Sequence, residues 1–140
     1  MKDKLNPFHL AIPVSNLEES VAYYRDTLGL REGRSSKKWA DFDFFGHQLV
    51  CHVSDSINEQ ITNAVDGEKV PVPHFGVVLS IEEFEEFLSQ INDKNVDFII
   101  KPTIRFKGEI GEQRTMFFKD PSGNAIEIKA FKDMDNLFRS

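Results

Sequence analysis

The sequence predicts an α+β fold in which two copies of one βαβββ module form a curved mixed sheet around a cavity. The first observation is a repeat: a strand-like segment that begins with a histidine leads into a capped helix twice. The two copies are 65 residues apart, at His9 and His74 and again at Ser15 and Ser80. The second observation is that each predicted helix is followed by further segments with the alternation of strands.

The first copy begins with "FHLAIPV", in which the apolar residues from Phe8 onward share one face and leave His9 on the other. In "SNLEESVAYYRDTLGL", Ser15 and Glu18 have the spacing of a capping box, apolar residues follow at helical spacing, and Gly29 supplies a C-terminal stop. The alternating segments "WADFDFF" and "HQLVCHV", joined by a glycine, predict strands.

The second copy repeats this order. "HFGVVL" leads into a helix that Ser80 and Glu83 cap and that Asn95 can stop. The strands "VDFII", "RTMFFKD" and "NAIEIKAF" follow, the last two joined by the turn "DPSG". Between the first two of them, "KPTIRFKGEIGEQ" is expected to be a charged loop.

We expect one domain over residues 1–140, organised as two modules with a connection and a tail. A short helix is expected within the connection, over 58–65. The expected segments are the first module at 6–54, the connection at 55–71, the second module at 72–131 and the tail at 132–140.

Composition excludes several classes of function. The 140-residue chain has a formal net charge of −6, which argues against binding nucleic acid or anionic lipid. Its N-terminus resembles neither a signal peptide nor a membrane span. A single cysteine, Cys51, predicts a cytoplasmic protein without an internal disulfide, and its strand pattern places it under the helices. Thirteen phenylalanines suggest an aromatic interior or a pocket for a flat, apolar small molecule.

Three predicted strands each place one metal-binding side chain on the face away from the helices. These are His9, His74 and Glu127. Two imidazoles and one carboxylate on one side of a divalent ion leave positions open for substrate and dioxygen, as in ferrous oxygenases. The sequence therefore predicts a metal site, with Fe(II) favoured and Mn, Zn, Ni or Co as alternatives.

The same alternation suggests which other residues line the cavity. His52 is the candidate acid or base, because an imidazole exchanges protons near neutral pH. The residues expected to line a substrate are Gln48, Val50, Thr115, Phe117, Trp39 and Arg114.

The quoted segments "HLAIPVSNLEESVAYYRDTLGL", "HFGVVL" and "MFFKDPSGNAIEIKAF", in their βαβββ order, resemble the vicinal oxygen chelate superfamily. This group includes glyoxalase I, extradiol dioxygenases, fosfomycin-resistance transferases and bleomycin-resistance proteins. The resemblance covers about residues 8–131. It implies that His9, His74 and Glu127 are the metal ligands and that two chains pair as a homodimer.

The chain departs from particular branches of that superfamily. Glyoxalase I enzymes have a fourth ligand where the hairpin count places Val50, although Gln48 or His52 would reach the ion if the register were shifted. Fosfomycin transferases have a tyrosine where this chain has Phe117, and a threonine where it has Ala11. Bleomycin-binding members usually lack the metal ligands.

The function expected from the sequence is that of an extradiol-like dioxygenase. Its metal would chelate two adjacent oxygens of a small, aromatic substrate. One alternative keeps the metal but catalyses isomerisation, epimerisation or thiol transfer. The other alternative is a non-catalytic protein that sequesters a flat, apolar ligand.

Overall fold

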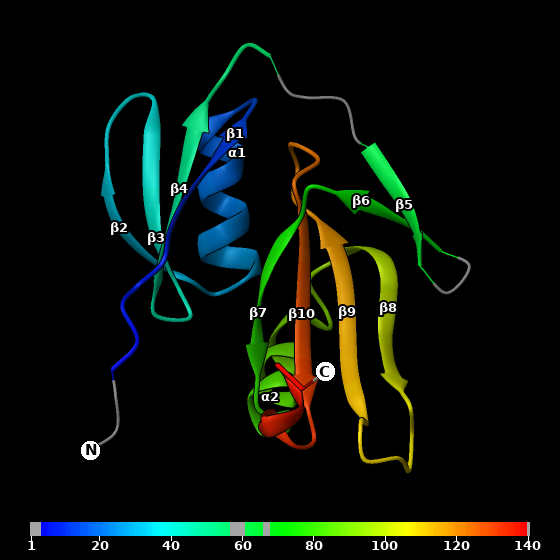
Figure 1. The fold of residues 1–140 in the computed structure, drawn as a ribbon. Helices are drawn as coiled ribbons and strands as arrows, with labels where there is room; N and C mark the ends of the chain where they lie inside the picture. Colours follow the sequence, from blue (N-terminus) through cyan, green and yellow to red (C-terminus); the bar gives the residue numbers. More distant parts are fainter. Residues whose placement is uncertain (1–3, 57–60, 66–67, 140) are drawn as a thin grey trace. The chain divides into compact units, whose positions relative to one another are not determined.

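The structure, a computed structural model, describes residues 4–56, 61–65 and 68–139. The chain divides into two compact units, Met1–Asn58 and Glu59–Ser140, and the division falls inside the expected connection. Each unit contains one βαβββ module (Figure 1). The α+β class and the duplicated module that the sequence predicts are therefore confirmed.

The first unit is a four-stranded mixed sheet in the order β1-β4-β3-β2, with β1 parallel to β4. The helix α1 continues directly into a π-helical segment, η1, and packs against β3 and β4. Tyr24, from η1, is fully buried, with its ring centroid 5.5 Å from that of Phe42 on β3. The elements are β1 (His9–Val14), α1 (Leu17–Ala22), η1 (Tyr23–Thr27), β2 (Arg31–Ser35), β3 (Trp39–Phe44) and β4 (His47–Val53).

The second unit repeats this sheet in the order β7-β10-β9-β8 and adds the two-stranded hairpin β5-β6. Its helix α2 packs against β10 and β7 and buries the apolar face that includes Phe84, Phe87 and Ile91. The elements are β5 (Ile61–Val65), β6 (Glu68–Val72), β7 (Phe75–Leu79), α2 (Ile81–Ile91), β8 (Asp97–Arg105), β9 (Gln113–Lys119), β10 (Ala125–Phe131) and the 3₁₀ turn η2 (Met134–Asn136).

The helix N-termini agree with the sequence in one unit and differ by one residue in the other, while α2 ends at Ile91, before the expected stop at Asn95. The capping box of α2 is confirmed: the Glu83 backbone N–H donates to the Ser80 hydroxyl, and the Ser80 N–H donates to the Glu83 carboxylate, both at 3.1 Å. In the first unit the cap is Asn16, whose side chain accepts from the N–H of Glu19, and not Ser15. An asparagine side chain is as good an N-cap acceptor as serine, so the residue nearer the apolar repeat takes the position.

Three other expectations are wrong. No helix forms over the described part of 58–65, where Ile61–Val65 is strand β5; the β-branched residues of "ITNAV" favour a strand. Residues 101–105, expected in a loop, extend strand β8. Phe8, which the alternation groups with the apolar, helix-facing side chains of the first strand, is 64% exposed, because it precedes β1 at the edge of the sheet.

The described part of the tail is folded against the loop before β9. It includes η2, and the Asn136 side chain donates a hydrogen bond of 2.9 Å to the backbone carbonyl of Ile110. Cys51 is fully buried, as its position in β4 predicts. None of the described helices combines the length and apolar character that crossing a bilayer requires.

Candidate metal centre

The strand register gives the two units equivalent positions for their central side chains. In the second unit Glu127 on β10 is paired with Gly76 on β7. In the first unit Val50 on β4 is paired with Ala11 on β1. Since Ala11 and Gly76 are 65 residues apart, Val50 is the counterpart of Glu127, as the hairpin count predicts. A valine has no donor atom, so the first unit has no metal ligand at this position.

His74 and Glu127 face each other within the second unit. The Nε2 atom of His74 is 4.0 Å from the Oε1 atom of Glu127. The side chains are partly buried, 32% exposed for His74 and 18% for Glu127. Two donor atoms that share one cation at about 2.1 Å each lie roughly 3 to 4 Å apart, so this pair fits a divalent ion.

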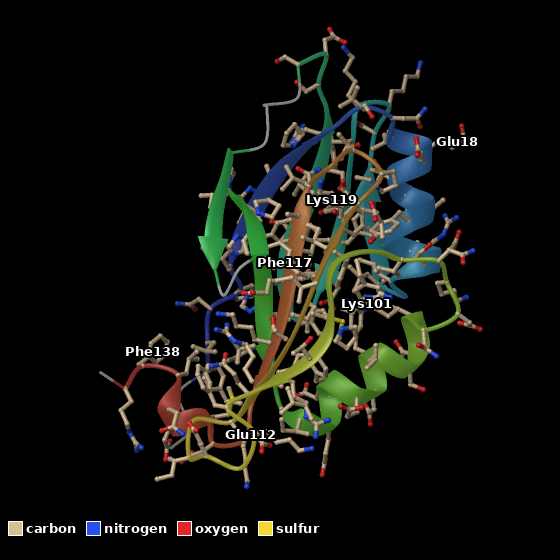
Figure 2. The ribbon with its side chains drawn as sticks, turned by 90° about the vertical axis from the view of Figure 1, so that its right-hand side faces the viewer. Glu18, Lys101, Glu112, Phe117, Lys119 and Phe138 are labelled. Carbon is tan, nitrogen blue, oxygen red and sulfur yellow. The ribbon has the colours of Figure 1, made fainter. Side chains whose placement is uncertain are left out.

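The ring of His74 is held from two sides. Its Nδ1 atom lies 2.7 Å from the backbone carbonyl oxygen of Pro71. A carbonyl oxygen only accepts, so Nδ1 carries the proton and Nε2 keeps its lone pair when the imidazole is neutral. The buried ring of Phe117, on β9 and labelled in Figure 2, packs edge-on against the imidazole, and the two ring centroids are 4.7 Å apart. The local geometry therefore presents Nε2 as a metal donor.

Two further side chains reach Glu127. Lys129, two residues along β10 and so on the same face, has its Nζ atom 3.3 Å from Glu127 Oε1. The hydroxyl of the buried Thr115 donates to Glu127 Oε2 at 3.4 Å. Strand alternation places Lys129 on the face of Glu127, further towards the edge, but the distance between the two side chains depends on their torsions.

Because Oε1 faces both His74 and Lys129, the ammonium group competes with a cation for the same oxygen. We expect Lys129→Met to tighten divalent metal binding by about 1 kcal/mol, or roughly fivefold, a size usual for a partly exposed charge pair. Isothermal titration with Co²⁺ measures the change. Lys132→Met, which removes the same charge outside β10, is the control; equal affinities for both variants would contradict the competition.

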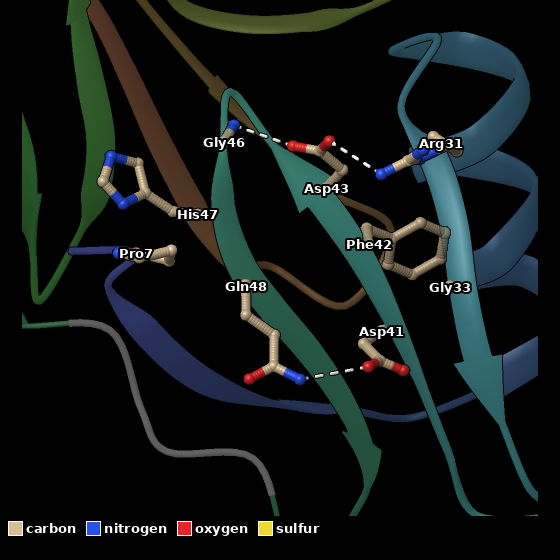
Figure 3. A pocket seen from close by; sticks show the side chains of 9 residues that line it. All are labelled: Pro7, Arg31, Gly33, Asp41, Phe42, Asp43, Gly46, His47 and Gln48. Carbon is tan, nitrogen blue, oxygen red and sulfur yellow. Dashed lines mark hydrogen bonds and ion pairs between the residues drawn. The ribbon is translucent and has the colours of Figure 1, made fainter. Parts of the chain in front are cut away.

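In the first unit His9 is the first residue of β1 and lies beside Gln48 in the register. Its Nδ1 atom is 2.7 Å from Gln48 Oε1. Gln48 also lines a pocket of about 260 Å³ formed by residues of the first unit alone (Figure 3). The same pocket is lined by Asp41, Asp43 and Arg31, so charged side chains form part of its wall.

Of the other residues predicted to line the site, some share the face of Glu127 and others lie away from the proposed ligands. Thr115 and Phe117 share the face of Glu127, as expected. His52, paired with Trp39 and Pro13, is exposed and four residues along β4 from Gln48. That spacing is about 13 Å of strand, which weighs against His52 acting on a group bound at His9.

The expectation that Arg114 lines the same cavity does not fit its placement. Its guanidinium forms an ion pair with Glu85 of α2, so it lies on the helix-covered face of the sheet. Arg114 is paired with Ala130 and adjacent to Thr115, and neighbouring residues of a strand point to opposite faces. Thr115 and Arg114 therefore cannot both face Glu127.

Neither unit alone provides three ligands. Within each unit, the described residues contain no group of three or more His, Cys, Asp or Glu side chains placed to hold a metal ion. His9 belongs to the first unit, and His74 and Glu127 belong to the second. The assignment of His9, His74 and Glu127 as the ligands of one ion therefore stays a prediction.

Comparison with known proteins identifies the family and its relatives. The family model described as "Glyoxalase/Bleomycin resistance protein/Dioxygenase superfamily" matches residues 6–128. The metallothiol transferase FosB of Staphylococcus saprophyticus is 25% identical over 129 residues, which cover 92% of this chain and 79% of that protein. FosB of Staphylococcus epidermidis is 26% identical over 132 residues, covering 92% and 86%.

Solved structures show the same fold. A glyoxalase/bleomycin resistance protein/dioxygenase from Alicyclobacillus acidocaldarius is 31% identical, covers 99% of this chain and 100% of its own, and has a TM-score of 0.80. The fosfomycin resistance protein FosX from Listeria monocytogenes is 21% identical with a TM-score of 0.67, covering 96% and 98%. The second likeness concerns the fold alone.

Proposed function

The chain belongs to the Glyoxalase/Bleomycin resistance protein/Dioxygenase superfamily, and from this premise we propose that it is a metal-dependent enzyme that transfers a small thiol to an electrophilic substrate. The observation that carries the metal requirement is the facing pair of His74 Nε2 and Glu127 Oε1. Thiol transfer is preferred to ring cleavage by dioxygen because curated relatives over 92% of the chain are metallothiol transferases.

The proposed ligands of the cation are His9, His74 and Glu127. A bound divalent cation supplies Lewis-acid polarisation of a substrate oxygen. Iron, manganese, zinc, nickel and cobalt are all compatible with two imidazoles and a carboxylate, so the chemistry of the ligands does not select one metal.

The surrounding residues of the second unit position and shield this chemistry. Phe117, fully buried against the His74 ring, excludes water from one side of the imidazole. Thr115 donates to Glu127 Oε2 and so orients the carboxylate. Lys129 adds a positive charge beside Glu127 and favours a substrate that carries or develops negative charge.

The proposed reaction is a substitution at carbon. The thiolate sulfur forms a bond to the electrophilic carbon while the carbon–oxygen bond of the substrate breaks. The oxygen keeps the electron pair and later takes a proton from water. No described side chain is assigned as the base that removes the thiol proton, and His52 remains only a candidate because of its distance along β4 from Gln48.

The substrate need not be a phosphonate. Phe117 has no hydroxyl with which to bind one, and Ala11, paired with Val50, has none either. We therefore propose testing two epoxides, fosfomycin and the uncharged 1,2-epoxypropane, with L-cysteine as the thiol.

The expected result is a cysteine adduct of at least one epoxide, detected by mass spectrometry. Adduct formation should stop after chelation of the metal and return after a divalent ion is added back. Protein without added metal and metal without protein are the controls. If neither epoxide gives an adduct above those controls with any of the five metals, thiol transfer is the wrong reaction class.

The second candidate is a dioxygenase, favoured by the absence of a fourth protein ligand at Val50, the counterpart of Glu127. Oxygen uptake with a catechol, measured with an electrode on Fe(II)-loaded protein, separates the two reactions. Metal-dependent oxygen uptake without adduct formation would favour the dioxygenase.

A further inference from the structure

Gln48 connects the proposed metal ligand His9 to a buried carboxylate. Gln48 Oε1 is 2.7 Å from His9 Nδ1, and Gln48 Nε2 donates to Asp41 Oδ2 at 3.0 Å. Figure 3 shows the second of these bonds, which runs between the neighbouring strands β4 and β3. The three side chains therefore form one continuous hydrogen-bonded chain within the first unit.

The direction of every hydrogen bond in this chain follows from Asp41. An ionised carboxylate only accepts, so the amide NH₂ of Gln48 must face Asp41 and its carbonyl oxygen must face His9. That oxygen also only accepts, so His9 Nδ1 must be the donor. When the imidazole of His9 is neutral, its Nε2 atom then has no proton and keeps a lone pair.

We propose that Gln48 and Asp41 are positioning residues that hold His9 in the Nδ1–H tautomer and so present Nε2 to the metal. This inference rests on the proposed function, because it assigns these residues a role at the same centre. Partners of a ligand imidazole that lie one step away from a metal fix both the tautomer and the plane of the ring.

The burial of Asp41 supports a role at the His9 site, because a charged residue that serves only solubility lies on the surface. Asp41 is 8% exposed, and its Oδ1 atom is buried without a hydrogen-bond partner in the described part of the chain. A buried carboxylate with one unsatisfied oxygen costs stability. The hydrogen bond to Gln48 is the contact through which this charge acts on His9.

The same contacts decide between two roles for Gln48. A glutamine in this strand can coordinate a metal directly, as the sequence left open. In the structure both polar ends of the Gln48 amide are already hydrogen-bonded, one to His9 and one to Asp41. Direct coordination would break at least one of these bonds, so the geometry favours orientation of His9 over ligation.

The second unit reaches the same tautomer by another route. His74 also has an acceptor at Nδ1, but it is the backbone carbonyl of Pro71. The position that matches Gln48, two residues after the hairpin glycine, is Ala125, which has no side-chain acceptor. Both histidines therefore meet the same chemical requirement with unrelated partners.

The first test measures the tautomer without metal. Nitrogen-15 NMR of the metal-free protein at mildly alkaline pH distinguishes a protonated from an unprotonated ring nitrogen; His9→Ala identifies the signal. Wild-type His9 should be protonated at Nδ1. Gln48→Leu and Asp41→Asn should both shift the signals toward a mixture of tautomers, because the acceptor is lost or the amide is free to turn over.

The matched control is Asp43→Asn. Asp43 is two residues from Asp41 on β3 and lies opposite Gln48 in the strand register, but its carboxylate accepts from the Gly46 backbone N–H and pairs with Arg31 rather than with the Gln48 amide. This variant makes the same chemical change on the same strand and should leave the His9 signals unchanged. An equal effect of Asp43→Asn and Asp41→Asn would contradict the positioning role.

The second test measures affinity for Co²⁺ by titration. Gln48→Leu should weaken binding by roughly 10- to 100-fold, the usual cost of losing such a partner. The double variant Asp41→Asn with Gln48→Glu should restore binding. In that variant the amide introduced at position 41 donates to the carboxylate introduced at position 48, and this carboxylate accepts from His9. The exchange also keeps the test valid if Gln48→Leu does not fold.

The outcomes separate this inference from the proposed function. If wild-type protein binds Co²⁺ but Gln48→Leu changes neither the tautomer nor the affinity, the positioning role is wrong and the metal site stands. If the variants alter the tautomer but wild-type protein binds no divalent ion, Gln48 and Asp41 do set the tautomer of His9 and the proposed function fails. Failure of the double variant to recover binding overturns the proposal that Asp41 acts on His9 through Gln48.

Discussion

Replacing His74 with alanine is expected to lower the bound divalent metal from about one ion per chain to almost none, because one of three protein ligands is lost. Of the proposed ligands, His74 has the most contacts that orient its ring. Pro71 fixes its tautomer, Phe117 packs on its ring, and Glu127 faces its Nε2 atom. Adduct formation should fall by at least about a hundredfold, since metal polarisation contributes several kcal/mol to such reactions.

Inductively coupled plasma mass spectrometry of dialysed protein measures the metal content. His52→Ala is the matched control, because it removes an exposed imidazole about 13 Å along β4 from the level of His9. That variant should keep its metal. Circular dichroism of both variants checks that the fold is kept. Undiminished metal in folded His74→Ala protein would remove His74 from the site and leave Glu127 without its partner.

Gly76→Ala is expected to destabilise the second unit by about 3 kcal/mol or more, a size typical of severe steric conflict in a sheet. A Cβ atom added at Gly76 would overlap the backbone carbonyl oxygen of Glu127. Both residues belong to paired strands, so neither backbone can move without loss of register between β7 and β10. Even a folded variant should bind metal poorly, because relief of the overlap displaces Glu127.

Urea unfolding followed by circular dichroism measures this loss. Gly111→Ala is the control, because a Cβ atom at Gly111 has no neighbour within 4 Å, and we expect a change below about 0.5 kcal/mol. The counterpart of Gly76 in the first unit is already an alanine, Ala11, so a small side chain is tolerated there. A stable Gly76→Ala variant with full metal content would show that β7 and β10 can separate without cost.

The sequence predicted the framework of this fold well because its signals are short-range and duplicated. The capping box at Ser80 and the 65-residue offset of the histidines are visible without any knowledge of packing. Predictions failed where two local patterns competed. Asn16 replaced Ser15 as the cap, and the polar connection that was expected to hold a helix contains the β5-β6 hairpin instead.

The candidate site was predictable in part. Alternation along β10 places Glu127 and Lys129 on one face, and the hairpin count correctly matched Val50 with Glu127. The sequence pattern did not reveal that Lys129 contacts Glu127 or that Arg114 forms an ion pair with Glu85 of α2. These contacts depend on side-chain torsions and on packing between distant segments, and a periodic sequence pattern carries no information about either.

By itself, the sequence determined the repeated module, the face on which each histidine lies and the chemical type of the three proposed ligands. These properties follow from strand periodicity, because a side chain's face is set by its position in the strand. Only the tertiary structure decided which ring nitrogen of His9 and His74 is free to bind a cation. That choice depends on acceptors from Gln48 and Pro71, and hydrogen-bond direction is defined only when the partners are in place.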